Sequence, residues 1–152
     1  MRVLVDTSVW SLALRRGKGS NGMEATELRR LVADHLVEMA GPIRQEILSG
    51  VRESSQFERL ARHLEPFPDA TIETEDYVTA AKFFNLCRTK RIQGSNTDFL
   101  ICAVAVRHGF AIFTADKDFP RFASCLPIVL HQVPSARRAT RKERLRYEEK
   151  RE

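Results

Sequence analysis

The chain has 152 residues, carries a formal net charge of +5, and is 43% hydrophobic and 30% charged. One domain typically holds about 100–200 residues, and this composition is that of a folded protein and not of a disordered one. The first apolar residues reach an acid at Asp6, too early for the core of a secretion signal. The apolar run at residues 99–106 is too short to cross a bilayer. We therefore expect a cytoplasmic protein that does not contact membranes.

The positive charge is concentrated at the C-terminal end. Residues 137–152 hold eight Lys or Arg and four Glu, so the rest of the chain is almost neutral. We predict one domain over residues 1–133 and a basic, mobile tail over residues 134–152. Such a tail either contacts nucleic-acid phosphates or is only a solvated extension.

The cysteines and histidines are scattered along the sequence. Cys87, Cys102 and Cys125 are odd in number and form no Cys-x-x-Cys pair. This favours buried thiols in a reducing compartment over a disulfide framework. The four histidines show no metal-ligand spacing, and we expect them to be ordinary surface or core residues.

The first elements alternate between strand and helix. The apolar residues 3–5 predict a buried strand, and Thr7 or Ser8 is expected to cap a short helix after it. Trp10 in that helix is expected to pack in the core, with a dimer interface as the alternative. The next segment, residues 24–34, predicts a helix that shows Leu28, Leu31 and Val32 on one face.

The alternation continues to the end of the predicted domain. Residues 36–40 predict a second strand, and a helix with Pro42 in its first turn and its end at Gly50 follows. The pattern Ser55-x-x-Glu58 is a capping box, which predicts the start of another helix. Further helices are expected over residues 75–90 and 97–108, and further strands over residues 111–114 and 127–131. This order indicates an α/β sandwich with a mainly parallel sheet.

Four acids stand where such a fold gathers side chains. Asp6 directly follows the first strand and Asp116 follows the third, and the carboxyl ends of parallel strands form a binding crevice. Glu46 lies on the helix after the second strand, and Asp98 lies in the first turn of the helix over residues 97–108. Carboxylates are the ligands that Mg²⁺ and Mn²⁺ prefer, and such a cation promotes phosphodiester hydrolysis. Spacing alone leaves a metal site and ordinary roles (helix cap, surface acid, dipole partner) equally open.

Four segments resemble, in order, the motifs of PIN domains: DTSVW at residues 6–10, EILSG at 46–50, GSNTDFLICAVA at 94–105 and TADKDF at 114–119. The chain thus resembles the PIN-domain ribonucleases, and among them the VapC-type toxins of toxin–antitoxin pairs. The resemblance runs from Met1 to about His131. It implies a three-layer α/β/α sandwich around the mainly parallel sheet.

The resemblance also implies roles for particular residues. The catalytic acids of the family fall on Asp6, Glu46, Asp98 and Asp116, of which Asp6, Asp98 and Asp116 bind the metal. Thr7 and Thr114 would orient metal-bound water. Asp118 either completes the acidic site or caps the helical turn after it, and the cap is slightly favoured.

The function that the resemblance implies is that of a Mg²⁺- or Mn²⁺-dependent endoribonuclease. Its partners would be an RNA substrate, a cognate antitoxin and a second copy of the chain in a homodimer. Two alternatives keep the same domain: a DNA-directed nuclease, and a partner-binding PIN domain without activity, which would lack one or more of the acids. A phosphatase-like enzyme of the haloacid dehalogenase type would need Asp-x-Asp after the first strand, and Ser8 stands at the second position.

Overall fold

A parallel sheet of four strands forms the centre of the molecule in this computed structural model, which describes residues 1–14 and 22–134. The strands lie in the order β2-β1-β3-β4, and each neighbouring pair is parallel. Their bounds are β1 (Val3–Val5), β2 (Val37–Glu38), β3 (Ala111–Phe113) and β4 (Val129–Leu130). The predicted parallel sheet is confirmed, although β2 and β4 are shorter than the sequence suggested.

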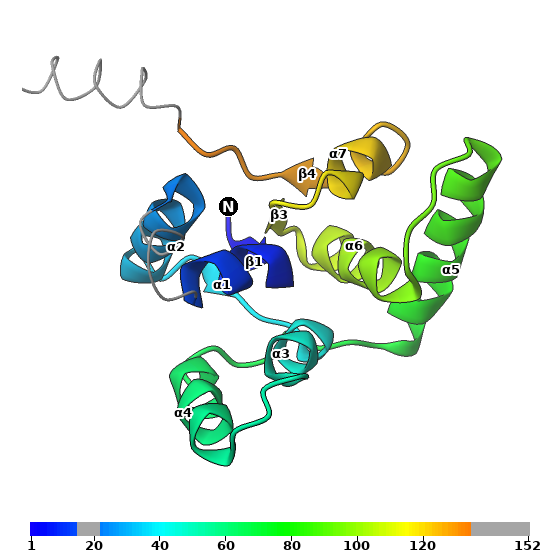
Figure 1. The fold of residues 1–152 in the computed structure, drawn as a ribbon. Coiled ribbons are helices and arrows are strands. Elements are labelled where there is room, and N and C mark those ends of the chain that lie inside the picture. The colour runs from blue at the N-terminus through cyan, green and yellow to red at the C-terminus, as the bar shows by residue number, and fades with distance from the viewer. Residues whose placement is uncertain (15–21, 135–152) are drawn as a thin grey trace, which may run out of the picture.

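Helices cover both faces of this sheet. Figure 1 shows α1 and α2 on one side, and α5 and α6 on the other. The α-helices of the described residues are α1 (Thr7–Leu14), α2 (Met23–Ala33), α3 (Gly41–Leu48), α4 (Ser54–Leu64), α5 (Thr74–Thr89), α6 (Asn96–His108) and α7 (Asp118–Ala123). The predicted three-layer α/β/α sandwich is confirmed.

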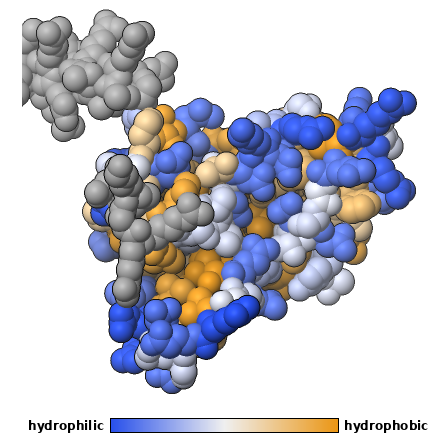
Figure 2. Space-filling view, viewed as in Figure 1, coloured by the Kyte–Doolittle hydropathy of each residue, from blue (hydrophilic) through white to orange (hydrophobic). Residues whose placement is uncertain are grey.

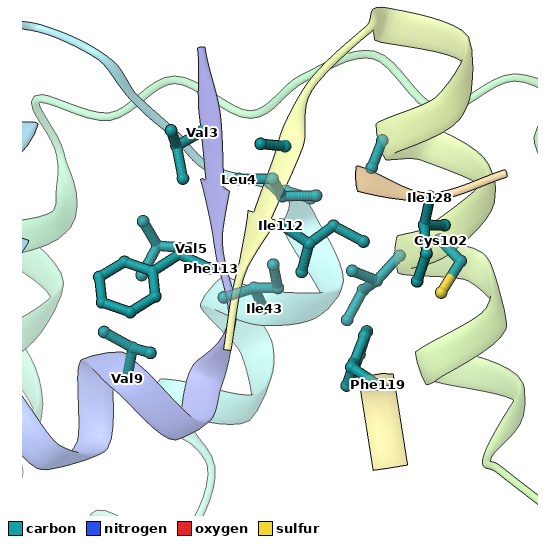
Figure 3. Close-up of a cluster of buried hydrophobic side chains, with 14 of the residues drawn as sticks. Val3, Leu4, Val5, Val9, Ile43, Cys102, Ile112, Phe113, Phe119 and Ile128 are labelled. Atoms are coloured by element: carbon teal, nitrogen blue, oxygen red, sulfur yellow. The ribbon is translucent and has the colours of Figure 1, made fainter. Parts of the chain in front are cut away.

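Alternation along the central strands divides the core between the two faces. In Figure 3 the side chains of Val3 and Val5 point to the side of α1, and Leu4 and Ile112 point to the side of α6. The side chains of β1 and β3 are all buried. Because both faces of a parallel sheet are covered, its strands must be apolar throughout, and this is why residues 3–5 carry no polar side chain.

Three local predictions are wrong, two on how a helix begins and one on which residues a helix buries. Neither Thr7 nor Ser8 caps α1, because the helix begins at Thr7 and the Ser8 hydroxyl donates to the Asp6 carboxylate. No capping box opens α4, since the helix begins at Ser54 with Glu53 as its N-cap. On α2, Val32 is 37% exposed and Glu27 is the buried residue instead.

Two other predictions concern residues outside the acidic segments. Trp10 packs in the core as expected, with its ring edge-on to Phe67 at a centroid distance of 5.4 Å. Residues 135–152 of the predicted tail lie outside the described residues. In the described part of the chain, no helix combines the length and the apolar composition that crossing a membrane requires.

Candidate active site

Asp6 lies at the carboxyl end of β1, in the middle of the sheet. Its backbone N–H donates to the carbonyl oxygen of Phe113 on the neighbouring strand β3, at 2.8 Å. Its carbonyl oxygen accepts the first amides of α1, so the chain turns sharply from strand to helix at this residue. The side chain of Asp6 is only 6% exposed. A carboxylate so buried needs hydrogen bonds or a cation beside it.

Two hydroxyl groups supply hydrogen bonds to the buried Asp6 carboxylate. Ser8 Oγ donates to Asp6 Oδ2 at 2.7 Å, and Thr114 Oγ1 donates to the same oxygen at 2.9 Å. Each hydroxyl also accepts a backbone N–H, from Ala115 and Asp116 respectively. The turn after β3 is thereby fixed to the turn after β1. One carboxylate oxygen, Oδ2, is thus committed to hydroxyl donors.

Glu46 reaches the same end of the sheet from α3. Pro42 stands in the first turn of α3, where its missing N–H is tolerated. Thr7 Oγ1 donates to Glu46 Oε2 at 2.7 Å, so the first turn of α1 holds the glutamate. Glu46 is exposed, unlike Asp6. The role expected for Thr7, the orientation of metal-bound water, stays a prediction; its hydrogen-bonding partner in the structure is Glu46.

Asp98 lies in the first turn of α6 and forms a capping box with Ser95. Ser95 N donates to Asp98 Oδ2 at 3.2 Å, and Asp98 N donates to Ser95 Oγ at 3.1 Å. Burial raises the pKa of Asp98 above its ordinary value, the hydrogen bonds from Ser95 partly offset this, and the negative charges of Asp6 and Asp116 raise it further. The structure therefore brings Asp98 within electrostatic reach of Asp6 and Asp116, which come from two separate strands.

Asp116 closes the turn between β3 and α7. Its Oδ1 accepts the N–H of Asp118, the first residue of α7, at 2.9 Å. The predicted cap at Asp118 is therefore supplied by the side chain of Asp116. In the described part of the chain the Asp118 carboxylate accepts no hydrogen bond.

The chemistry of this donor set matches a hard cation. All four acids offer carboxylate oxygens, the ligands of Mg²⁺ and Mn²⁺, and the charges of Asp6 and Asp116 add to burial in raising the pKa of Asp98. Among residues 1–14 and 22–134, no three His, Cys, Asp or Glu side chains converge closely enough to hold one ion. Mg²⁺ usually binds through one or two carboxylates and keeps several waters. The residues thus fit such an ion with water completing its shell.

Ser8 and Ser95 are polar contacts of the site that the sequence did not single out. Ser8 was read as a helix cap and Ser95 as part of a loop, yet each hydrogen-bonds an acid of the site. In both cases a spacing in the sequence could have predicted the contact. Asp6-Thr7-Ser8 places a hydroxyl two residues after the acid, and Ser95-x-x-Asp98 is a capping-box spacing.

The comparisons with known proteins identify the family of this chain. The PIN-domain family matches over residues 3–124. VapC ribonuclease Mb1587 of Mycobacterium bovis is 34% identical over 122 residues, which are 77% of this chain and 88% of that protein. Ribonuclease VapC11 of Mycobacterium tuberculosis shows the same identity and coverage.

Solved structures share the fold at lower identity. VapBC2 from Rickettsia felis, bound to a promoter DNA fragment, superposes with a TM-score of 0.68 at 16% identity, covering 86% of this chain and 98% of that one. FitAcB from Neisseria gonorrhoeae gives a TM-score of 0.66 at 18% identity, covering 85% and 96%. With the fold, the four motifs and the family match in agreement, the chain belongs to the PIN-domain family, among its VapC ribonucleases.

Proposed function

We propose that this protein is a Mg²⁺- or Mn²⁺-dependent endoribonuclease in which Asp6, Asp98 and Asp116 hold the cation, in part through its bound waters, and Glu46 completes the catalytic set. The observation that supports this most is the meeting of three acids at one end of the sheet: Asp98 has a raised pKa, caused first by burial and further by the charges of Asp6 and Asp116. None of the three forms an ion pair with Lys or Arg of the described residues. Carboxylates held together in this way repel one another unless a cation joins them. The relatives at 34% identity are named ribonucleases, and this supports RNA as the substrate that we propose.

The bound cation would acidify a water and neutralise charge on the phosphorus oxygens. The residues of the chain would then do the positioning. Ser8 and Thr114 hold Asp6 Oδ2, which would leave Oδ1 available to bind the cation. Thr7 holds Glu46 Oε2, which leaves Oε1 to accept a hydrogen bond from the attacking water.

The direct test is cleavage of matched RNA and DNA oligonucleotides by the full chain, with Mg²⁺, with Mn²⁺ and with excess chelator. We expect RNA cleavage that disappears with chelator and is abolished by Asp6→Asn. The amide oxygen of asparagine can accept the bonds from Ser8 and Thr114, so the variant should fold while the charge is lost. Glu75→Gln, which removes an exposed acid of α5, is the control for charge alone. Cleavage that persists in chelator, or DNA cleaved as well as RNA, would contradict the proposal.

The biological role that we propose is that of a toxin held inactive by a cognate antitoxin. The solved structures with this fold include VapBC and FitAB assemblies. A groove of about 390 Å³ between the end of α1 and α4 is lined by the apolar residues Leu14, Val51 and Leu60 and by the polar residues Gln56, Arg59 and His63. Figure 2 shows apolar surface beside polar surface in this part of the molecule. We infer that an apolar segment of the antitoxin binds there, with a cationic side chain directed to the acids.

Growth experiments test this role. Expression of the protein alone in the cytoplasm of a bacterial host should arrest growth, and co-expression of the neighbouring small gene product should restore it. Leu60→Asp should abolish the rescue but leave the arrest, because it alters the groove and not the acids. Normal growth in cells that contain intact, folded protein would contradict the toxin role. We also expect the protein without its antitoxin to be a homodimer, which its molecular mass in solution would show.

A further inference from the structure

Two thiols far apart in the sequence meet between α5 and the end of α7. Cys87 Sγ lies 3.0 Å from Cys125 Sγ, 38 residues away. This Sγ–Sγ distance is shorter than the van der Waals contact of two sulfur atoms, and it exceeds the length of a covalent S–S bond by about 1 Å. Cys102 also lies nearby on α6, yet among the described residues Cys125 is the only thiol within hydrogen-bonding distance of Cys87.

Both cysteines stand on backbone that is already fixed. The carbonyl oxygen of Cys87 accepts the N–H groups of Lys90 and Ile92 where α5 ends. Cys125 N donates to the carbonyl oxygen of Phe122 in the last turn of α7, at 3.0 Å. Closing the remaining gap therefore needs only side-chain rotation and a small displacement. A pair placed so closely by its own fold has a high effective concentration for bond formation.

We propose that Cys87 and Cys125 are a redox site that forms a reversible intramolecular disulfide when the protein meets a peroxide. The inference does not depend on the proposed ribonuclease activity. It would tie the C-terminal end of α5 to the end of α7, two elements that no other hydrogen bond or ion pair of the described residues joins directly.

The two cysteines differ in a way that sets the order of the chemistry. Cys125 is partly exposed, whereas Cys87 is fully buried, and burial raises the pKa of the Cys87 thiol to about 12. The peroxide therefore reacts first at Cys125, whose sulfur takes one oxygen to become a sulfenic acid while the other peroxide oxygen leaves as water or an alcohol. The Cys87 sulfur then attacks the Cys125 sulfur. The S–S bond forms, the S–O bond breaks, and the hydroxyl leaves with the Cys87 proton as a second water.

The test uses the full-length protein treated with hydrogen peroxide and then with dithiothreitol. Of the three cysteines in the chain, we expect two to be unreactive to a thiol-alkylating probe after peroxide and to react again after dithiothreitol, with the probe added to the unfolded protein because Cys87 and Cys102 are buried. The intact mass should fall by about 2 Da as two hydrogens are lost, and proteolysis should release a linked peptide that contains Cys87 and Cys125. A cross-link over this distance should also raise the melting temperature by about 10 °C.

Single variants separate this pair from the third cysteine. Cys102→Ser should keep the mass change, because Cys102 takes no part. Cys125→Ser should lose it, and Cys87→Ser should instead leave a sulfenic acid at Cys125 that a dimedone probe captures. A disulfide that joins Cys102 to either residue, a linkage between two chains, or three thiols still free after peroxide would overturn the proposal. None of these readouts depends on RNA cleavage, so failure here and failure of the proposed function are distinguishable.

Discussion

The hydroxyl oxygens of Ser8 and Thr114 lie 3.3 Å apart, although the residues are 106 positions apart in the chain. Each has a single hydrogen, and each donates it to Asp6 Oδ2. Their contact with each other is therefore a consequence of sharing one carboxylate oxygen. This arrangement joins the first strand end to the third and fixes the direction in which the Asp6 carboxylate faces.

Removing either hydroxyl should impair catalysis more than folding. For Thr114→Val or Ser8→Ala we expect a loss of about 10- to 100-fold in RNA cleavage, as for other groups that orient metal ligands. The free energy of unfolding should fall by about 1 kcal/mol, the net value of one hydrogen bond. Single-turnover cleavage and chemical denaturation measure the two effects.

Thr114→Ser is the matched control, because it keeps the hydroxyl and should retain most of the activity. The double variant Ser8→Ala/Thr114→Val should lose less than the product of the two single losses, since both hydroxyls act on one oxygen. Strictly multiplicative losses would show that the two residues act separately.

The sequence predicted the sheet and its acids better than it predicted the small polar contacts. The short apolar runs predict which segments of the chain form buried parallel strands. Asp6 and Asp116 could be placed because the carboxyl ends of parallel strands share one edge. The partner of Ser8 could not, because a serine beside a helix start can bond either the backbone or a neighbouring carboxylate. Which of these two hydrogen bonds forms depends on tertiary contacts. The same holds for the buried Glu27, which contacts Arg30 on its own helix but also His131, 104 residues away.

Asp98→Asn should stabilise the metal-free protein at neutral pH. Burial and the nearby negative charges raise the pKa of Asp98 in the folded state above its unfolded value. The ionised carboxylate therefore costs stability at pH values above the folded pKa, and this cost disappears as the pH falls below the ordinary value of about 3.9. Asparagine carries no charge, and its amide oxygen can still accept the bond from Ser95. The variant should melt higher than the parent at pH 7, and the gap should close near pH 3.5.

Melting curves in chelator over this pH range measure the effect. Mg²⁺ should then stabilise the parent protein more than Asp98→Asn, because the cation relieves the same repulsion. A variant that melts below the parent at pH 7, by the same margin as at low pH, would show that the Asp98 charge is not the source of strain.

Asp116→Asn and Asp118→Asn should separate the two acids of the turn before α7. Both variants can keep the local structure, because an asparagine oxygen at position 116 still accepts the N–H of Asp118. We expect Asp116→Asn to lower cleavage by at least about 100-fold, as removal of a metal ligand does, and Asp118→Asn to change it by less than about 3-fold. Equal losses would place Asp118 among the catalytic acids.

The C-terminal residues 137–152, with eight Lys or Arg and four Glu, should strengthen RNA binding in a salt-dependent way. A chain truncated after residue 136 should keep its metal dependence, bind RNA more weakly, and show a flatter dependence of the dissociation constant on salt. Filter binding across a salt series measures this. An unchanged salt slope would exclude the segment from RNA contact.

Gly94→Ala should destabilise the fold through sterics alone. A Cβ at this position would lie 2.5 Å from Phe122 Cζ and 3.0 Å from Phe99 Cε2, and both rings are buried. Phe122 belongs to α7, which begins two residues after Asp116, and Phe99 follows Asp98. Displacing these rings should cost about 1–3 kcal/mol in the free energy of unfolding. It should also lower cleavage, because Asp98 precedes Phe99 and Asp116 accepts the first N–H of α7, the helix that carries Phe122.

Two further variants isolate that cause. Phe122→Leu removes the ring atoms nearest the added methyl group, so Gly94→Ala should cost less in its presence than in the parent, as a double-mutant cycle by denaturation would measure. Gly109→Ala tests a glycine at which backbone conformation and not close packing opposes a side chain. Position 109 has φ +74°, and no atom lies within 4 Å of an added Cβ. This substitution should cost about 1 kcal/mol through backbone conformation and leave cleavage unchanged, since Gly109 ends α6 far from the acids in its first turn. Equal effects of Gly94→Ala with and without Phe122 would show that the close approach of the glycine to this ring does not hold α7 and Asp116 in place.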